Sequence, residues 1–166
     1  MIRVRPAQTE DVEWVLAESA RVGGPRVVSR GTLFDLARYP ALVAWHEGDR
    51  VGLAIYHAQP PEAELLAIAA TQQWQGAGTA LLMEVEALAT RAGCERIALV
   101  TTNDNTDALR FYQRRGYRLT AVHPDAFDEV LRLKGLTNDA PVIGHHDIVI
   151  RDELLLTKAL VADPPA

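Results

Sequence analysis

The stretch AELLAIAATQQWQGAGTALL, Ala63 to Leu82, decides the expected fold of this chain. Its first part is apolar apart from Glu64, and it leads into a turn in which Gly76 and Gly78 stand two residues apart. After the turn, apolar residues recur at the spacing of a helix with one buried face: Leu81, Leu82, Val85, Leu88 and Ala89. The stretch therefore predicts a strand, a tight turn and a helix.

The glycines of this turn point to an anion site at the start of the helix. The first N–H groups of a helix have no partner inside it, and together with the helix dipole they favour an anion such as phosphate. Glycine lets a phosphate approach the main chain because no Cβ stands in the way. The alternative is that the glycines only permit the tight turn, and so short a pattern does not by itself separate the two interpretations.

Two well-known phosphate-binding patterns do not match the turn. A P-loop requires a lysine followed by serine or threonine after its second glycine, and this sequence has neither in that place. A dinucleotide fingerprint requires a third glycine, where this chain has Leu81. A dinucleotide-binding oxidoreductase is therefore disfavoured.

Composition limits the class of protein. The chain has 166 residues, of which 48 % are apolar and 23 % charged, as expected for a single globular domain over residues 1–166. A net charge of −5 argues against a nucleic-acid binder, and the single cysteine excludes an internal disulfide. Because we find neither an apolar leader nor an apolar run long enough for a bilayer, we expect a cytoplasmic protein that does not enter membranes.

The rest of the chain completes an α/β pattern. We expect further strands over residues 2–5, 41–45, 51–57, 97–101, 117–122 and 148–156, and further helices over residues 9–21, 32–38, 104–115 and 124–134. A strand, a crossover helix and a strand make the segments 63–70 and 97–101 parallel partners. We therefore predict one mixed sheet, antiparallel in its first half, with a parallel pair at its centre.

A second pattern, NTDALRFYQRRGY, covers residues 105–117. Taken alone it is an amphipathic helix with a polar cap at its start and a glycine at its end. The two patterns, Q-x-x-G-x-G at residues 73–78 and N-x-x-A-x-x-F-Y-x-x-x-G-Y at residues 105–117, follow each other in this order on the expected elements. In this they resemble the acetyl-CoA loop and the next helix of the GNAT superfamily of N-acetyltransferases. The resemblance in element order covers nearly the whole chain.

The resemblance implies the GNAT fold, a central mixed β-sheet with a splayed parallel strand pair and helices on both faces. It also implies acetyl-CoA as cosubstrate. We expect no metal, because the chain has only Cys94 and because no further ligand cluster accompanies the adjacent His145 and His146. Acetyl-CoA would contact the end of the first parallel strand, the glycine turn and the start of the later helix: Ile68, Ala69, Ala70, Gln73, Trp74, Gln75, Gly76, Ala77, Gly78, Thr79 and Asn105. Trp74 and Ala77 differ in size from the usual family residues, but neither removes an N–H group.

The same resemblance suggests two catalytic side chains. Tyr112 stands where GNAT enzymes often keep a tyrosine near the CoA sulfur, and a phenol there would protonate the leaving thiolate. Glu64 lies on the strand where several GNAT enzymes carry a glutamate that acts as base through water. The alternatives are a core tyrosine whose hydroxyl bonds main chain and a carboxylate left in solvent by strand alternation.

The implied reaction is direct attack of a primary amine on acetyl-CoA in a ternary complex. The acceptor would be a small molecule or a protein amine, bound by residues 22–31 and 123–147. Arg26 or Arg30 would hold an acceptor carboxylate in a bidentate contact, and the alternative for each is a solvated surface arginine. A second hypothesis is a non-catalytic acyl-CoA-binding regulator of the same fold. The chain would act as a monomer or a homodimer.

Overall fold

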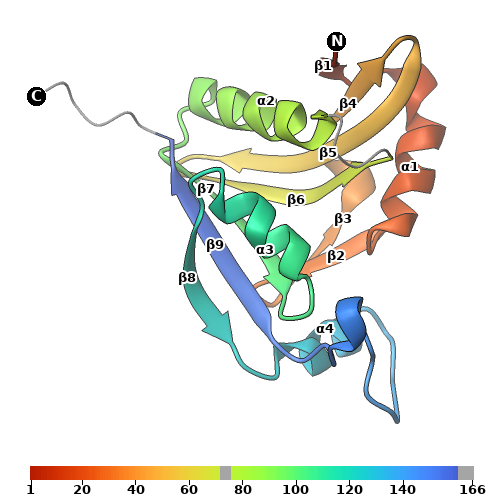
Figure 1. Cartoon of the computed structure of the whole chain (residues 1–166), viewed down its shortest axis with the longest axis vertical. Coiled ribbons are helices and arrows are strands. Elements are labelled where there is room, and N and C mark those ends of the chain that lie inside the picture. The colour runs from red at the N-terminus through yellow and green to blue at the C-terminus, as the bar shows by residue number, and fades with distance from the viewer. Residues whose placement is uncertain (72–75, 161–166) are drawn as a thin grey trace, which may run out of the picture. The chain divides into compact units, whose positions relative to one another are not determined.

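The computed structural model describes residues 1–71 and 76–160 (Figure 1). The strands are β1 (Arg3–Pro6), β2 (Arg26–Ser29), β3 (Thr32–Asp35), β4 (Ala41–His46), β5 (Asp49–Gln59), β6 (Glu62–Ala70), β7 (Arg96–Thr102), β8 (Arg118–His123) and β9 (Glu153–Ala159). The α-helices are α1 (Val12–Arg21), α2 (Ala77–Arg91), α3 (Thr106–Gln113) and α4 (Ala126–Leu133). Short 3-10 turns lie at η1 (Thr9–Asp11), η2 (Leu36–Arg38) and η3 (His145–Asp147).

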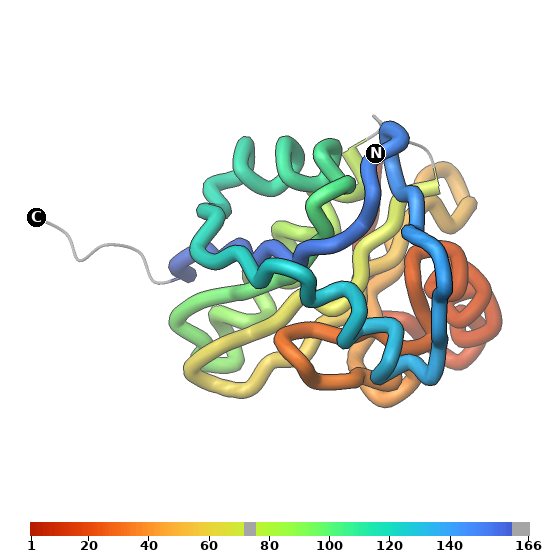
Figure 2. The backbone as a smooth tube through the Cα atoms, turned by 90° about the horizontal axis from the view of Figure 1, so that it is seen from below, coloured from red at the N-terminus to blue at the C-terminus, as the bar shows by residue number. Residues whose placement is uncertain are grey.

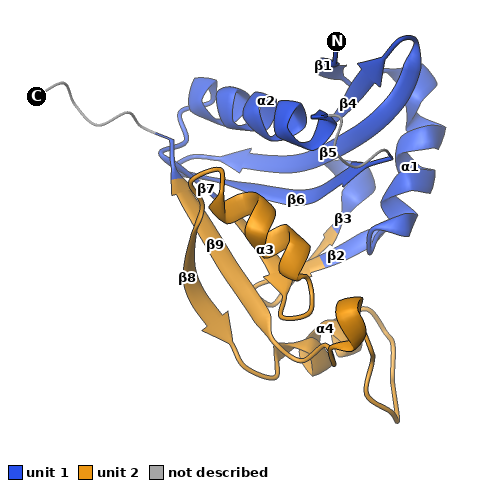
Figure 3. Cartoon of the chain, viewed as in Figure 1, with its two compact units in different colours: residues 1–27, 35–97, 159–166 blue, residues 28–34, 98–158 orange. Residues whose placement is uncertain are grey.

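The chain divides into two compact units, coloured separately in Figure 3. Unit 1 comprises residues 1–27, 35–97 and 159–166, and unit 2 comprises residues 28–34 and 98–158. The expectation that residues 1–166 act as one domain stays a prediction.

The core of unit 1 is an antiparallel sheet in the order β1-β4-β5-β6. Side chains alternate across it, so Leu53 and Ile55 of β5 pack with Val15 of α1 on one face. On the other face, Leu81 of α2 lies against Gly52, and α2 makes its main contacts with β5 and β6. Helices therefore cover both faces of this sheet (Figure 1).

Unit 2 contains strands in the order β7-β9-β8, with β8 and β9 antiparallel. Figure 2 traces these two strands side by side, and their register places His123 opposite Glu153. The short hairpin β2–β3, α3 and α4 complete the unit. Helix α3 packs against β8, with Tyr112 edge-on to Tyr117 at 5.5 Å between ring centroids.

Most of the expected elements are confirmed, including the antiparallel first half of the sheet, but two expectations are wrong. The helix expected over residues 32–38 is strand β3 followed by the single turn η2. The apolar residues there fit a helical spacing, but the chain instead reverses at Arg30 and Gly31, which have φ angles of +49° and +77°, and pairs with β2. Sheet pairing overrides local preference in such a segment.

The last strand begins at Glu153, five residues later than the expected start at Ile148. The side chain of Asn103 holds the intervening backbone. Its Nδ2 donates to the carbonyl of Val149 at 2.9 Å, and its Oδ1 accepts from the N–H groups of Arg151 at 2.9 Å and Asp152 at 3.0 Å. Backbone groups bound to a side chain are not available for a strand ladder.

Candidate active site

The start of α2 has the features expected of a phosphate-binding turn. Gly76 precedes the helix with φ +80°, and a Cβ placed on it would meet no atom of residues 1–71 or 78–160 within 4 Å. The first turn of the helix contains no acidic residue. Ala77 is buried, whereas Gly78 and Thr79 are partly exposed. Small side chains and a glycine at the start of a helix suit a pyrophosphate, because the dipole and the first N–H groups of a helix favour an anion.

The other residues predicted to contact acetyl-CoA divide between described and undescribed parts of the chain. The last three residues of β6 are Ile68, Ala69 and Ala70. They pair with Ala54, Leu53 and Gly52 of β5, all within unit 1. They are only partly buried. Gln73, Trp74 and Gln75 lie outside the described residues.

Glu64 is buried in β6, with 8 % of its surface exposed. Strand register places it opposite His57, between the fully buried Ala63 and the buried Leu65 on the opposite face. The alternative of a carboxylate left in solvent is therefore wrong. The role of Glu64 as general base stays a prediction.

Tyr112 lies on α3 of unit 2 and is 6 % exposed. Its ring packs edge-on against Phe111 at 5.2 Å and against Tyr117 at 5.5 Å. No described residue makes a hydrogen bond to its hydroxyl, so the alternative of a phenol tied to main chain is not supported within residues 1–71 and 76–160. Burial raises the pKa of Tyr112, which keeps the phenol protonated.

Asn105 is the N-cap of α3. Its Oδ1 accepts from the N–H of Ala108 at 3.2 Å, which satisfies one of the helix's first N–H groups. The capping role is thus observed, and the contact with acetyl-CoA stays a prediction.

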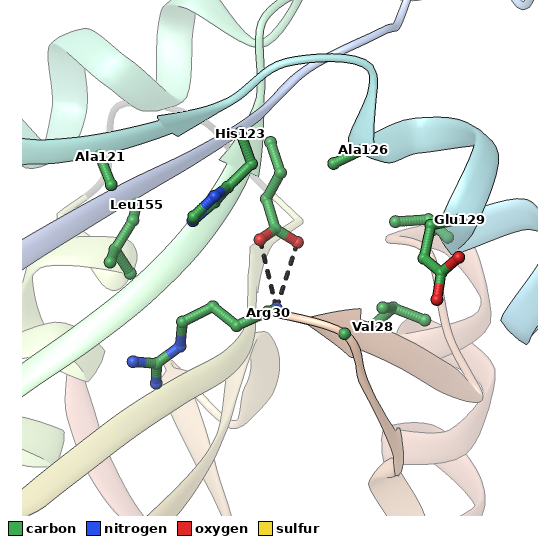
Figure 4. A pocket seen from close by; sticks show the side chains of 10 residues that line it. Val28, Arg30, Ala121, His123, Ala126, Glu129 and Leu155 are labelled. Atoms are coloured by element: carbon green, nitrogen blue, oxygen red, sulfur yellow. Dashed lines mark hydrogen bonds between the residues drawn. The ribbon is translucent and has the colours of Figure 1, made fainter.

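Unit 2 contains a hollow of about 350 Å³ between the β2–β3 hairpin, strands β8 and β9, and helix α4 (Figure 4). Its apolar lining comes from Val28, Ala121, Ala126, Val130 and Leu155, and its polar lining from Arg30, His123, Glu129 and Glu153. Of the two arginines proposed to hold an acceptor carboxylate, Arg30 lines the hollow, whereas Arg26 belongs to unit 1.

Glu153 is the functional candidate that the sequence analysis missed. It is 5 % exposed, and both of its carboxylate oxygens accept from the N–H of Arg30, at 3.2 and 3.3 Å. These two residues are 123 positions apart in the chain, so no local pattern connects them. The available signal was an acidic residue at the head of the apolar run Leu154–Leu156.

The adjacent residues His145 and His146 belong to no cluster of metal ligands in the described part of the chain. The N–H of His145 donates to Asp104, and Nε2 of His146 lies 3.3 Å from Asp107. In the described residues no group of three or more His, Cys, Asp or Glu side chains is placed to hold a metal ion. Nor does any helix in that part of the chain have the length and apolarity needed to cross a membrane.

Comparison with known proteins decides the family. Residues 10–117 match the model of the acetyltransferase (GNAT) family. The chain belongs to the GNAT family. It is also 36 % identical over 139 residues to the uncharacterized protein YdhI of Bacillus subtilis (strain 168), covering 83 % of this chain and 85 % of that protein. The chain is accordingly an acyltransferase of the acetyltransferase type.

Solved structures confirm the fold class. A Bacillus subtilis acetyltransferase in complex with CoA matches with a TM-score of 0.74 at 22 % identity, over 97 % of this GNAT chain and 100 % of that one. The ribosomal-protein-S18-alanine N-acetyltransferase of Escherichia coli matches with a TM-score of 0.69 at 19 % identity, over 99 % and 97 %. The predicted α/β GNAT fold is thus confirmed.

Proposed function

We propose that this GNAT chain, acting as one domain over residues 1–166, transfers the acetyl group of acetyl-CoA to a primary amine in a ternary complex. The observation that carries the proposal is the start of α2, with Gly76 at φ +80° and no acid in the first turn. The first-turn N–H groups of residues 77–79 would hold the pyrophosphate, together with Gln73, Trp74 and Gln75 of the preceding turn. The CoA found in a structural neighbour supports the same cosubstrate.

The proposed chemistry assigns one proton to each of two residues. Glu64 takes a proton from the acceptor ammonium through water, which frees the nitrogen lone pair for attack on the acetyl carbonyl. A main-chain N–H near Ala69 or Ala70 stabilises the tetrahedral oxyanion. When the carbon–sulfur bond breaks, Tyr112 donates its proton to the thiolate. After attack the nitrogen loses its second proton, which restores the phenol of Tyr112. The products are the acetamide and free CoA, and the proton taken by Glu64 passes to solvent.

The acceptor is a small-molecule or protein amine. The small hollow of unit 2 favours a small molecule, and the ribosomal-protein acceptor named for one structural neighbour keeps a protein amine as the second possibility. Either Arg30 of unit 2 or Arg26 of unit 1 would hold an acceptor carboxylate.

Thermal unfolding with and without acetyl-CoA tests the proposal. A ligand at 100 times its Kd stabilises the native state by about 2.7 kcal/mol, or roughly 5–10 °C in Tm for a chain of this size. We expect this shift with acetyl-CoA and CoA and its loss in Gly76→Trp, with no shift from NAD or ATP. Gly48→Trp is the matched control, because Gly48 also has a positive φ, +93°, and open space around it.

Two outcomes would argue against the proposal. The absence of any shift with CoA ligands at saturating concentration would contradict acetyl-CoA binding. A shift without turnover across a broad panel of amines would instead favour the non-catalytic acyl-CoA-binding alternative.

A further inference from the structure

The hollow of unit 2 has a mostly apolar lining. The lining residues come from the β2–β3 hairpin, strands β8 and β9, and helix α4, and most of the surface that they expose to the hollow is apolar. In Figure 4 Ala121 and Leu155 lie on one side of the space, and Val28 and Ala126 lie on the other. Such a surface gains most from a ligand group that is itself apolar, because both then leave water.

The charged residues that line the hollow already have partners. Both carboxylate oxygens of Glu153 accept from the N–H of Arg30, at 3.2 and 3.3 Å, and each of these two residues makes a further interaction. Glu129 accepts from Nη2 of Arg132 at 2.7 Å and from Nε at 3.2 Å. A charged ligand group would have to compete with these partners and would also lose its own hydration. The lining therefore favours an uncharged group.

Helix α4 provides a second observation. Its apolar residues gather on one face, yet none of its 8 residues, all of them within the described chain, is buried. Ala126 and Val130 stand about one turn apart on this helix, and both line the hollow. The apolar face of a helix is normally buried against other apolar groups. An apolar ligand in the hollow would cover the part of this face to which Ala126 and Val130 belong.

We propose that this hollow holds the apolar body of a small-molecule acceptor, a primary amine whose body is an alkyl chain or a hydrocarbon ring. A closed apolar cavity of about 150 Å³ holds one benzene molecule. A hollow of about 350 Å³ therefore has room for an alkyl chain or for a ring with a short chain. This proposal rests on the acetyltransferase function and names the class of its acceptor. An apolar amine does not require the carboxylate contact proposed for Arg30 or Arg26.

Calorimetric titration of the CoA-saturated protein tests the proposal without requiring turnover. The probes are ethylamine, butylamine and hexylamine, which share one ammonium group and differ only in their methylene groups. Each buried methylene should tighten binding by about fourfold, until the hollow is full. Two probes of similar length, 6-aminohexanoate and 1,6-diaminohexane, carry a second charge at the far end. We expect both to bind about tenfold or more weakly than hexylamine, because the second charge would lose its hydration in an apolar lining.

Two variants locate the apolar body of the ligand. Ala121→Phe fills the hollow from β8, so it should remove most of the gain from butylamine to hexylamine and change ethylamine binding little. Val130→Thr on α4 keeps the shape of the side chain but adds a hydroxyl group, and we expect it to weaken hexylamine binding about three- to tenfold. Val122 is the matched control position, because it follows Ala121 on β8, is 49 % exposed and lies outside the lining. Val122→Phe and Val122→Thr should bind the whole series as the wild type does.

Equal affinities for ethylamine and hexylamine, while CoA still raises the Tm, would overturn the apolar assignment and leave the acetyltransferase function standing. Tighter binding of 6-aminohexanoate or of the diamine than of hexylamine would overturn it in favour of an acceptor with a second charge. Equal weakening in Ala121→Phe and Val122→Phe would show that the apolar body binds outside the hollow. Absence of the CoA shift itself would instead overturn the proposed function.

Discussion

Oδ1 of Asp11 accepts a hydrogen bond from Nε of Arg50 at 2.8 Å, which ties the start of α1 to the β4–β5 hairpin of unit 1. Asp11 is fully buried, and its Oδ2 also accepts from Nη1 of Arg5 at 2.6 Å and from the N–H of Gln8 at 2.8 Å. Both guanidinium groups stack on the ring of Trp45, at 4.9 and 4.8 Å. The carboxylate of Asp11 thus pairs with both arginines that stack on Trp45.

Replacing Asp11 by alanine should therefore destabilise the protein by about 3 kcal/mol, because two partly buried arginines lose their shared partner. Urea unfolding at pH 7 measures the change. Glu10→Ala is the control, since Glu10 pairs with the same Arg5 at 3.3 Å but has a side chain that is 65 % exposed, and it should cost less than about 1 kcal/mol. Equal losses in the two variants would contradict the importance of burial.

The contribution of Asp11 should also depend on pH. Burial by itself raises the pKa of Asp11, but the hydrogen bonds from Gln8, Arg50 and Arg5 outweigh it, and the pKa in the folded state lies below the usual value. A lowered pKa stabilises the fold above the unfolded value of about 3.9, and this contribution is lost as the pH falls through the folded pKa. The stability gap between wild type and Asp11→Ala should be constant from pH 5 to 7 and narrow below pH 4. A gap that widens in acid would contradict this.

Tyr112→Phe should lower kcat about 100-fold, the size expected for loss of a general acid, and leave the KM for acetyl-CoA unchanged. Because burial raises the pKa of Tyr112, wild-type activity should show no alkaline limb from this residue up to pH 10. Steady-state kinetics across pH measures both effects. Tyr117→Phe is the control, since Tyr117 is equally buried and packs on the same ring. An equal loss in both variants would indicate a packing role only.

The sequence predicted those features that depend on neighbours in the chain and missed those that depend on distant ones. Periodicity and glycines located β4, β5, β6, α2 and α3, because each carries its own apolar pattern and its own terminal signal. Strand β3 and the late start of β9 escaped prediction, since the first depends on pairing with β2 and the second on the side chain of Asn103. For the same reason, no pattern connected Arg30 with Glu153.

Gly52→Ala should weaken acetyl-CoA binding by displacing the end of β6. A Cβ on Gly52 would lie 2.7 Å from the carbonyl oxygen of Ala69 and 3.0 Å from Cδ1 of Leu81. To make room, the backbone of β6 and the Leu81 side chain of α2 would have to shift. We expect a loss of about 1–3 kcal/mol in stability and a several-fold rise in the Kd of acetyl-CoA, measured by calorimetry. Gly48→Ala, which meets open space, should strain only its own turn and leave the Kd unchanged.

Asp104→Ala should loosen the segment that precedes β9. Asp104 is buried, accepts from the hydroxyl of Thr102, and accepts from the N–H of His145 at 2.9 Å. Removing the carboxylate leaves that N–H without its partner, at a cost of about 1–3 kcal/mol. Hydrogen exchange should accelerate at residues 144–148, because their tie to the end of β7 is lost.

Residues 149–152 provide an internal reference for this experiment, because Asn103 holds them and is unchanged in the variant. Asp107→Ala is the matched control variant, since Asp107 contacts the side chain of the neighbouring His146 at 3.3 Å but is largely exposed. It should leave exchange at residues 144–148 near the wild-type rate. Equal acceleration over residues 144–152 in Asp104→Ala would mean that the two ties open together, and unchanged exchange would show that Asp104 does not anchor the segment.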